Sequence, residues 1–288
     1  MKRLKRLRRL AIAYVMVCGL LWLGQERLLF WPSATIKRTP EAHDLAYEDV
    51  WLPVPSADGT SERLHGWWIP ATHPDAPVLL YLHHNAVNVS ANLSQAEDFQ
   101  ELGCTVLLID YRGFGHSEGK FPTESRVYQD AEATWDYLIQ KRGIAANRIV
   151  IYGHSLGSAI ALNLAANHPE AAAAIVQNPF TSMRDMSKRF GIFWLFPVDL
   201  LLRQKFNSIG KVRQLQMPIL FIHGMRDPQI PYTMSQTLFA VAPEPKQLLL
   251  IPDQGHDNNM QDRDLAVVGR FLQTVLGNSA SDPGTWKP

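Results

Sequence analysis

The chain has 288 residues, of which 46% are hydrophobic, and a formal net charge of +1 at neutral pH. This length and apolar content are enough for one large hydrophobic core, so a single folded domain is expected. A nearly neutral chain lacks the strongly basic face that nucleic-acid binding needs, and nucleic acid is therefore excluded as a partner. Two cysteines, Cys18 and Cys104, are too few for a disulfide framework.

The N-terminus combines a basic stretch with an apolar one. Six of residues 1–9 are lysine or arginine, and residues 10–24 then run without a charge. This arrangement is typical of a secretory signal, but no Ala-x-Ala cleavage site follows, so residues 1–27 are predicted to remain as a signal-anchor helix. The basic end would stay in the cytoplasm, which places the rest of the chain on the periplasmic or extracytoplasmic side of a single-pass membrane protein. The alternatives are a cleaved signal peptide and an amphipathic helix that lies on the membrane surface.

After a linker over residues 28–45, the hydrophobic pattern alternates between strand and helix periodicity. Strands are expected near residues 48–52, 64–69, 78–82, 106–109, 149–152, 174–177, 219–222 and 248–251. Helices are expected near residues 94–102, 124–141, 156–167, 234–241 and 265–276. Strands that alternate with helices form parallel βαβ units, and uniformly apolar strands are covered on both faces. The sequence therefore predicts an α/β domain over residues 46–278 with a mostly parallel eight-stranded sheet, followed by a polar tail at 279–288.

The five residues Gly153-His154-Ser155-Leu156-Gly157 stand between a β-branched apolar run and an alanine-rich helical segment. Strand, tight turn and helix in this order form a nucleophile elbow, in which the central side chain is exposed on a sharp, strained turn. Glycine is needed on both sides because a Cβ there would collide with the neighbouring strand or helix. Ser155 is therefore the candidate nucleophile.

A nucleophilic serine needs a base to take its proton and an acid to orient that base. Asp227 lies in a loop after the strand at 219–222, and His256 lies in a Gly-containing loop after the strand at 248–251. The chain order serine, aspartate, histidine is that of α/β hydrolases and differs from the orders in chymotrypsin-like and subtilisin-like proteases. Asp253, three residues before His256, is the rival acid.

The oxyanion hole of such an elbow uses two backbone N–H groups. One donor is the residue after the nucleophile, Leu156, which also lies at a helix N-terminus. The second comes from the loop after the strand at 78–82, where Asn85 is the expected donor. The neighbouring His83 and His84 are too few to hold a metal, since zinc sites use at least three protein ligands. No metal and no cofactor is therefore predicted.

Residues 180–217 form an insertion long enough to be a lid over the active site. The segment combines an apolar run at 190–196 with basic residues on both sides. Amphipathic lid helices bury such apolar faces, and aromatic residues beside basic ones also suit an anionic membrane interface. We therefore expect the lid to contact the bilayer through side chains such as Trp194 and Phe196 and to present an acyl chain to Ser155.

Several stretches of the chain resemble the α/β-hydrolase superfamily, in particular small-lid, membrane-anchored α/β-hydrolase-domain proteins of the serine aminopeptidase-like type. They are residues 108–119 (LIDYRGFGHSEG), the elbow, residues 178–182 (NPFTS) and the two loops that carry Asp227 and His256. The resemblance implies a triad of Ser155, Asp227 and His256 that hydrolyses esters, thioesters or amides without a cofactor. In these relatives the loop after the third strand usually begins His-Gly-Asn-Ala-Gly-Asn, whereas here His84 and Val87 stand at the two glycine positions.

The predicted function is that of a serine hydrolase that cleaves a carboxylic ester or thioester with an apolar acyl group, through an acyl-enzyme on Ser155. The expected partners are a small-molecule or lipid-like acyl substrate and the membrane, which the N-terminal helix and the lid contact. One alternative is a serine peptidase or amidase. The other is a catalytically silent membrane-bound binding protein, for which the replacements at His84 and Val87 are the main support.

Overall fold

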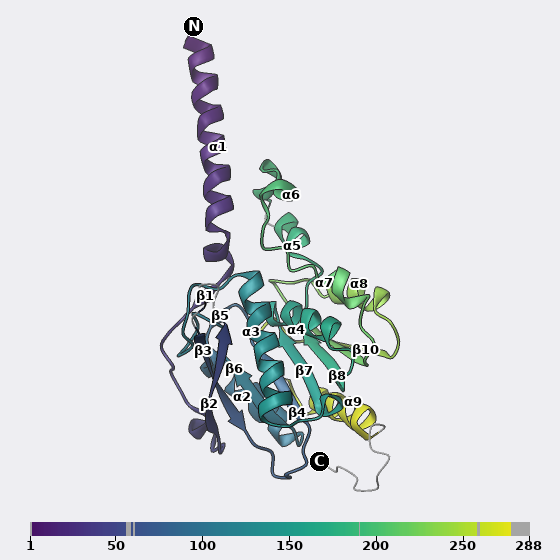
Figure 1. Cartoon of the computed structure of the whole chain (residues 1–288). Coiled ribbons are helices and arrows are strands. Elements are labelled where there is room, and N and C mark those ends of the chain that lie inside the picture. Colours follow the sequence, from purple (N-terminus) through teal and green to yellow (C-terminus); the bar gives the residue numbers. More distant parts are fainter. Residues whose placement is uncertain (1, 56–58, 60, 190, 258–259, 278–288) are drawn as a thin grey trace.

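An eight-stranded sheet forms the centre of the molecule (Figure 1). The computed structural model describes residues 2–55, 59, 61–189, 191–257 and 260–277, so the polar tail expected at 279–288 lies outside the described residues. The strand order is β10-β9-β8-β7-β4-β6-β3-β2. The pairings of β3 with β2 and β6 are antiparallel and the others are parallel, which confirms the mostly parallel sheet. The strands are β2 (Glu48–Pro55), β3 (Ser61–Ile69), β4 (Val78–Leu82), β6 (Thr105–Ile109), β7 (Ile149–His154), β8 (Ala173–Gln177), β9 (Ile219–Gly224) and β10 (Lys246–Ile251).

The central strands are apolar on both faces because helices cover both faces. In β4, Val78, Leu80 and Leu82 pack into one buried cluster, whereas Leu79 and Tyr81 pack into the cluster on the opposite face. This alternation is the two-residue period of a strand. Burial on both faces explains why the sequence shows uninterrupted apolar runs rather than alternating ones.

Helices α3, α4, α7 and α8 cover one face of the sheet, and α2 and α9 cover the other. The alanine-rich α4 is buried along almost its whole length and packs against β7 and β8. The helix expected over 124–141 is shorter than predicted, because its last turn at Tyr137–Lys141 has π-helical geometry. The bounds are α2 (Leu93–Glu101), α3 (Glu124–Asp136), α4 (Leu156–Asn167), α7 (Ser208–Val212), α8 (Thr233–Val241) and α9 (Asp262–Gly277).

The N-terminal helix α1 (Lys2–Leu29) projects away from this domain (Figure 1). Among the helices of the described residues, it alone is long and apolar enough to cross a membrane, and none of its residues is buried. Its 28 residues extend over about 42 Å, at a rise of about 1.5 Å per residue. By length and composition the helix fits either a membrane anchor or a signal sequence.

The linker after α1 is packed onto the domain. Phe30 is buried against the rings of Phe114 and Phe206. The short strand β1 (Trp31–Pro32) then pairs in parallel with β5 (Ala86–Val87), which belongs to the loop after β4. The chain thus connects the end of α1 directly to the loop in which the oxyanion donor is expected.

The segment between β8 and β9 extends from the domain on the same side as α1 (Figure 1). Before α7 it contains α5 (Met183–Arg189), a short turn at Phe193–Leu195 and α6 (Val198–Leu201). Several of its large apolar side chains are exposed: Ile192, Trp194, Leu195 and Leu200. The segment lies where the lid is expected, and we call residues 180–217 the lid below.

Candidate active site

Ser155 stands on the turn between β7 and α4. Its backbone has φ 54° and ψ −119°, a strained conformation for a residue with a side chain. Close packing around the turn explains the two glycines. A Cβ on Gly153 would lie 2.2 Å from the Gly157 carbonyl oxygen, and a Cβ on Gly157 would lie 2.0 Å from the Leu82 carbonyl oxygen. The local geometry is that of a nucleophile elbow.

The structure brings Ser155, His256 and Asp227 together from three separate loops. The Nε2 atom of His256 lies 2.9 Å from the Oγ atom of Ser155. The Nδ1 atom of the same ring lies 2.6 Å from Oδ2 of Asp227. All three side chains are buried. Because the carboxylate accepts the Nδ1 proton, Nε2 is free to accept the hydrogen of the serine hydroxyl. We call these three residues the relay.

Asp227 lies in the loop after β9 and is held in place by its neighbours. Its Oδ1 accepts the backbone N–H groups of Gln229 at 2.7 Å and Ile230 at 2.9 Å. Burial by itself raises the pKa of this carboxyl, but hydrogen bonds from His223, His256 and Ile230 outweigh it, so the pKa is lowered. Asp227 is therefore charged at neutral pH and can hold the histidine ring in one tautomer.

Asp253, the rival acid, lies outside the relay. Its carboxylate forms an ion pair with Arg226, with 2.9 Å between the charged atoms, and both side chains are mostly exposed. Asp253 therefore takes part in a surface ion pair and not in a contact with His256.

Two residues that lie within the quoted motifs, but to which no role was assigned from the sequence, hold the backbone of His256. The side-chain Nε2 of His154 and the side-chain amide of Asn178 both donate to the His256 carbonyl, at 3.0 and 2.7 Å. The amide oxygen of Asn178 also accepts the N–H of Gly224 at 3.1 Å, which connects the end of β9 to the same point. Asn178 has φ 48°, a left-handed conformation in which asparagine is enriched. An asparagine directly after an apolar strand was the signal available in the sequence.

Leu156 and Asn85 border the same cavity as Ser155. Leu156 begins α4, so its N–H is one of the first donors of the helix, which have no acceptor within the helix. The side-chain amide of Asn85 donates to the Leu29 carbonyl at 2.5 Å, and its backbone carbonyl accepts the Trp31 N–H at 2.9 Å. These bonds fix the backbone of Asn85, and no acceptor within the described part of the chain takes its N–H.

His84 and Val87, the two departures from the loop of similar proteins, differ in backbone conformation. Val87 has φ 62°, where a β-branched residue is rare, and a strain of about 1–3 kcal/mol is expected there. Val87 is held by its pairing with Pro32 and by the N–H of Ser33, which donates to its carbonyl at 2.8 Å. His84 does not have a positive φ. Burial is the main cause that lowers the pKa of His84 to about 3, so its ring is neutral.

A cavity of about 830 Å³ has Ser155 in its wall, together with residues of the lid and of α1. Its volume lies within the range of about 300–1,000 Å³ that is typical of ligand sites. Most of the surrounding side chains are apolar, among them Leu21, Leu28, Leu29, Trp31, Phe180, Met183, Met186, Phe193, Phe196, Val198, Leu201, Leu202 and Ile230. We call it the acyl cavity, after the acyl group that the sequence leads us to expect as its ligand.

One group of side chains in the described residues is compact enough to hold a metal ion, namely His154, His256 and Asp257, whose candidate ligand atoms lie within 4.8 Å of one another. The relay uses both ring nitrogens of His256, and Nε2 of His154 donates to a carbonyl. The group therefore fits a hydrogen-bonded site better than a metal centre.

Comparisons with known proteins agree with this architecture. A model of the prolyl oligopeptidase family matches residues 90–279. The uncharacterized protein Rv2307c of Mycobacterium tuberculosis is 34% identical over 262 residues, which cover 90% of each chain. The α/β hydrolase domain-containing protein WAV2 of Arabidopsis thaliana is 33% identical over 250 residues, or 79% of each chain. The esterase Pf2001 of Pyrococcus furiosus has a similar fold, with a TM-score of 0.69 and 21% identity, and the match covers 85% of this chain and 97% of that chain.

The family match extends over more than half of the chain and includes the elbow, Asp227 and His256. It agrees with the sheet topology and with the strained turn at Ser155. The chain is therefore a hydrolase of the α/β fold and belongs to the prolyl oligopeptidase family of the α/β-hydrolase superfamily.

Proposed function

We propose that the protein is a serine hydrolase that cleaves carboxylic esters or thioesters with an apolar acyl group. The observation that carries the proposal is the relay beside the acyl cavity: Ser155, His256 and Asp227 are joined by contacts of 2.9 and 2.6 Å, and the serine borders a mostly apolar cavity. A nucleophile and its base within hydrogen-bond reach, with the base oriented by a third group, are the signature of nucleophilic catalysis.

In the proposed mechanism, Ser155 Oγ attacks the carbonyl carbon of the substrate while His256 Nε2 takes the hydroxyl proton. The same proton passes to the leaving alcohol or thiol, and an acyl-enzyme remains. Water then attacks the acyl-enzyme, with His256 again acting as the base, and the carboxylic acid leaves. The charged Asp227 stabilises the imidazolium that forms in each step. The backbone N–H groups of Leu156 and Asn85 are the proposed donors to the oxyanion.

A peptidase is the second candidate, because the matching family is described by the name of a peptidase. The acyl cavity favours the ester and thioester assignment, since its walls offer many apolar side chains and few polar groups that could bind a peptide backbone. The ratio of kcat/KM for a 4-nitrophenyl ester to kcat/KM for a peptide 4-nitroanilide distinguishes the two, and a higher value for the anilide would favour the peptidase.

We also propose that α1 spans a membrane once. Its first residues carry six positive charges, which the positive-inside rule assigns to the cytoplasm. The hydrolase domain then lies on the extracytoplasmic side, and the lid faces the membrane because it extends on the same side as α1 (Figure 1).

Covalent labelling of the full-length protein with a fluorophosphonate probe tests the nucleophile. Wild-type protein and Ser125→Ala, a variant at an exposed serine of α3, are expected to be labelled, whereas Ser155→Ala is expected to lose the label. Hydrolysis of 4-nitrophenyl butanoate is expected to fall by at least about 10³-fold in Ser155→Ala. Absence of labelling in folded wild-type protein would instead favour a silent binding protein.

A further inference from the structure

The helix α1 contacts the lid along more than three turns. Near its middle, the hydroxyl of Tyr14 donates to the carbonyl of Leu195 at 2.9 Å. The ring of Tyr14 is also stacked on that of Phe196, with 5.8 Å between the centroids. The helix is therefore more than a tether, because a part of it far from the domain packs against the lid.

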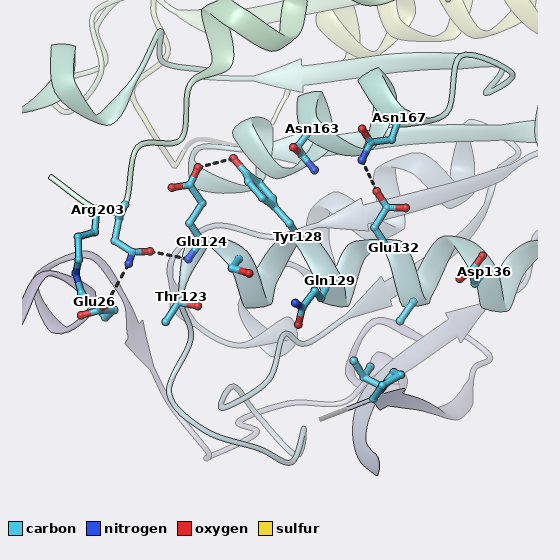
Figure 2. A pocket seen from close by; sticks show the side chains of 15 residues that line it. Glu26, Thr123, Glu124, Tyr128, Gln129, Glu132, Asp136, Asn163, Asn167 and Arg203 are labelled. Carbon is cyan, nitrogen blue, oxygen red and sulfur yellow. Dashed lines mark hydrogen bonds and ion pairs between the residues drawn. The ribbon is translucent and has the colours of Figure 1, made fainter. Parts of the chain in front are cut away.

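Nearer the domain, Gln25 and Glu26 bind the end of the lid. The amide of Gln25 donates to the Leu201 carbonyl at 2.7 Å and accepts the N–H of Arg203 at 2.7 Å. The carboxylate of Glu26 accepts from the Arg203 guanidinium at 2.5 Å and from the Gln204 amide at 3.1 Å. Figure 2 shows Glu26 and Arg203 at one end of a second, more polar cavity beside α3. These polar contacts hold the lid and the base of α1 together.

On the other side of these contacts, α1 forms part of the wall of the acyl cavity. Leu21, Gln25, Leu28 and Leu29 all border it. Positions separated by four, seven and eight residues lie on one face of a helix, so a single face of α1 is directed toward the cavity. Ser155 borders the same cavity, and the acyl cavity therefore joins α1 to the candidate nucleophile.

The contact at Tyr14 determines the depth of the lid relative to a membrane. Tyr14 lies within the charge-free residues 10–24, about 22 Å along the helix axis from Leu29. If α1 spans the bilayer, the part of the lid that reaches Tyr14, at Leu195 and Phe196, lies within the hydrocarbon. Two lid side chains fit this position, since Trp194 is 80% and Leu200 is 81% exposed in the absence of a membrane. The exposed charges of Arg184 and Asp199 in the same segment pair with each other.

We propose that α1 and the lid form a lateral entrance through which the acyl chain of a membrane lipid passes from the bilayer to Ser155. The substrate class is a long-chain acyl ester that resides in the same membrane as the protein. The inference rests on the proposed function, and it adds a role for the anchor helix: its face at Leu21, Gln25 and Leu28 binds the chain.

The test uses the full-length protein in phosphatidylcholine vesicles, with 4-nitrophenyl octadecanoate and 4-nitrophenyl butanoate as substrates. Leu21→Trp fills the α1 side of the acyl cavity and is expected to lower the ratio of octadecanoate to butanoate hydrolysis by about tenfold or more. The matched control is Leu23→Trp, at an exposed position two residues along the helix and off the cavity face, and it is expected to keep the wild-type ratio. Equal ratios in the two variants would overturn the proposal.

A second variant guards against an indirect effect of the large tryptophan. Gln25→Leu removes the hydrogen bonds to Leu201 and Arg203 at similar side-chain volume, so the lid is held against α1 only by the remaining contacts of Tyr14 and Glu26. It is expected to lower the same ratio. An unchanged ratio would show that the contact between α1 and the lid has no part in binding long chains.

The source of the substrate is tested by placing the octadecanoate ester either in the vesicles that carry the protein or in separate protein-free vesicles. Faster hydrolysis in the shared vesicles is expected, and equal initial rates would exclude entry from the bilayer. Failure of the proposed function is distinguishable from these results, since wild-type protein would then hydrolyse neither ester and would not react with a fluorophosphonate.

Discussion

The relay and the acyl cavity occupy neighbouring places but are built by different parts of the molecule. Ser155, Asp227 and His256 follow three strands of one buried sheet, and hydrogen bonds between side chains and backbone hold the loops that carry Asp227 and His256. The acyl cavity is enclosed largely by α1 and the lid, which carry many exposed side chains and meet through a small number of polar contacts.

The two sites are built differently because they have different physical requirements. The proposed proton transfer between Ser155 and His256 needs its atoms placed within tenths of an ångström, and a close-packed sheet supplies this rigidity. A cavity for an apolar chain needs area and shape rather than exact directions, because hydrophobic contact is non-directional. Changes in the relay should therefore affect the chemical step for every substrate, whereas changes in α1 should affect the choice of substrate.

Apart from removal of the nucleophile itself, the largest effect is expected for Asp227→Asn. An amide at this position no longer fixes the tautomer in which His256 Nε2 accepts the serine proton, so kcat for 4-nitrophenyl butanoate should fall by about 10³–10⁴-fold. Asp253→Asn is the matched control, since that carboxylate pairs with Arg226 at the surface. A comparable loss in both variants, or a larger one in Asp253→Asn, would contradict the assignment of the orienting acid.

A smaller effect, on stability, is expected for Gly157→Ala. The new Cβ would lie 2.0 Å from the Leu82 carbonyl oxygen, so the strand and the helix must move apart. We expect the free energy of unfolding to fall by about 1–3 kcal/mol or more, measured by urea denaturation of the full-length protein in detergent. Gly191→Ala, in the lid, has no heavy atom near its added Cβ and should change little. If both substitutions were tolerated equally, close packing would not be what requires glycine at the elbow.

The smallest expected effect is on the pH dependence of stability, and it comes from His84 in the loop after β4. The partly buried ring of His84 has its pKa lowered to about 3, mainly by burial, whereas an unfolded histidine titrates near 6.5. Between these values the unfolded state binds more protons, so the folded protein loses stability as the pH falls below about 6.5. His84→Gln should reduce the loss between pH 7 and pH 5 by about 1–2 kcal/mol.

Urea midpoints at the two pH values measure this change, and His73→Gln, at an exposed histidine, is the control. The buried His154, whose pKa is also lowered to about 3 mainly by burial, should keep part of the acid sensitivity in both variants. If His84→Gln and His73→Gln had the same pH dependence, His84 would not be a neutral group in the folded protein.

Local patterns in the sequence were enough to predict the sheet. The apolar runs predicted eight strands, and all eight are present, because strands buried on both faces must be apolar throughout. Glycines on both sides of Ser155 predicted a tight turn. The structure explains both glycines in the same way, because an added Cβ at Gly153 would collide with the Gly157 carbonyl oxygen and one at Gly157 would collide with the Leu82 carbonyl oxygen. By contrast, the hydrogen bonds of His154 and Asn178 to the His256 carbonyl join positions far apart in the chain, and no local pattern encodes them.

The sequence by itself therefore determined the strand order along the chain, the elbow and the candidate residues of the relay, since each depends on neighbouring residues. Only the tertiary structure decided which aspartate meets His256, because both Asp227 and Asp253 follow strands in suitable loops. It also decided that the N-terminal helix borders the acyl cavity, through contacts such as that of Gln25 with Leu201, more than 170 residues away. Contacts at such separation depend on how the whole chain packs, and hydrophobic periodicity carries no information about them.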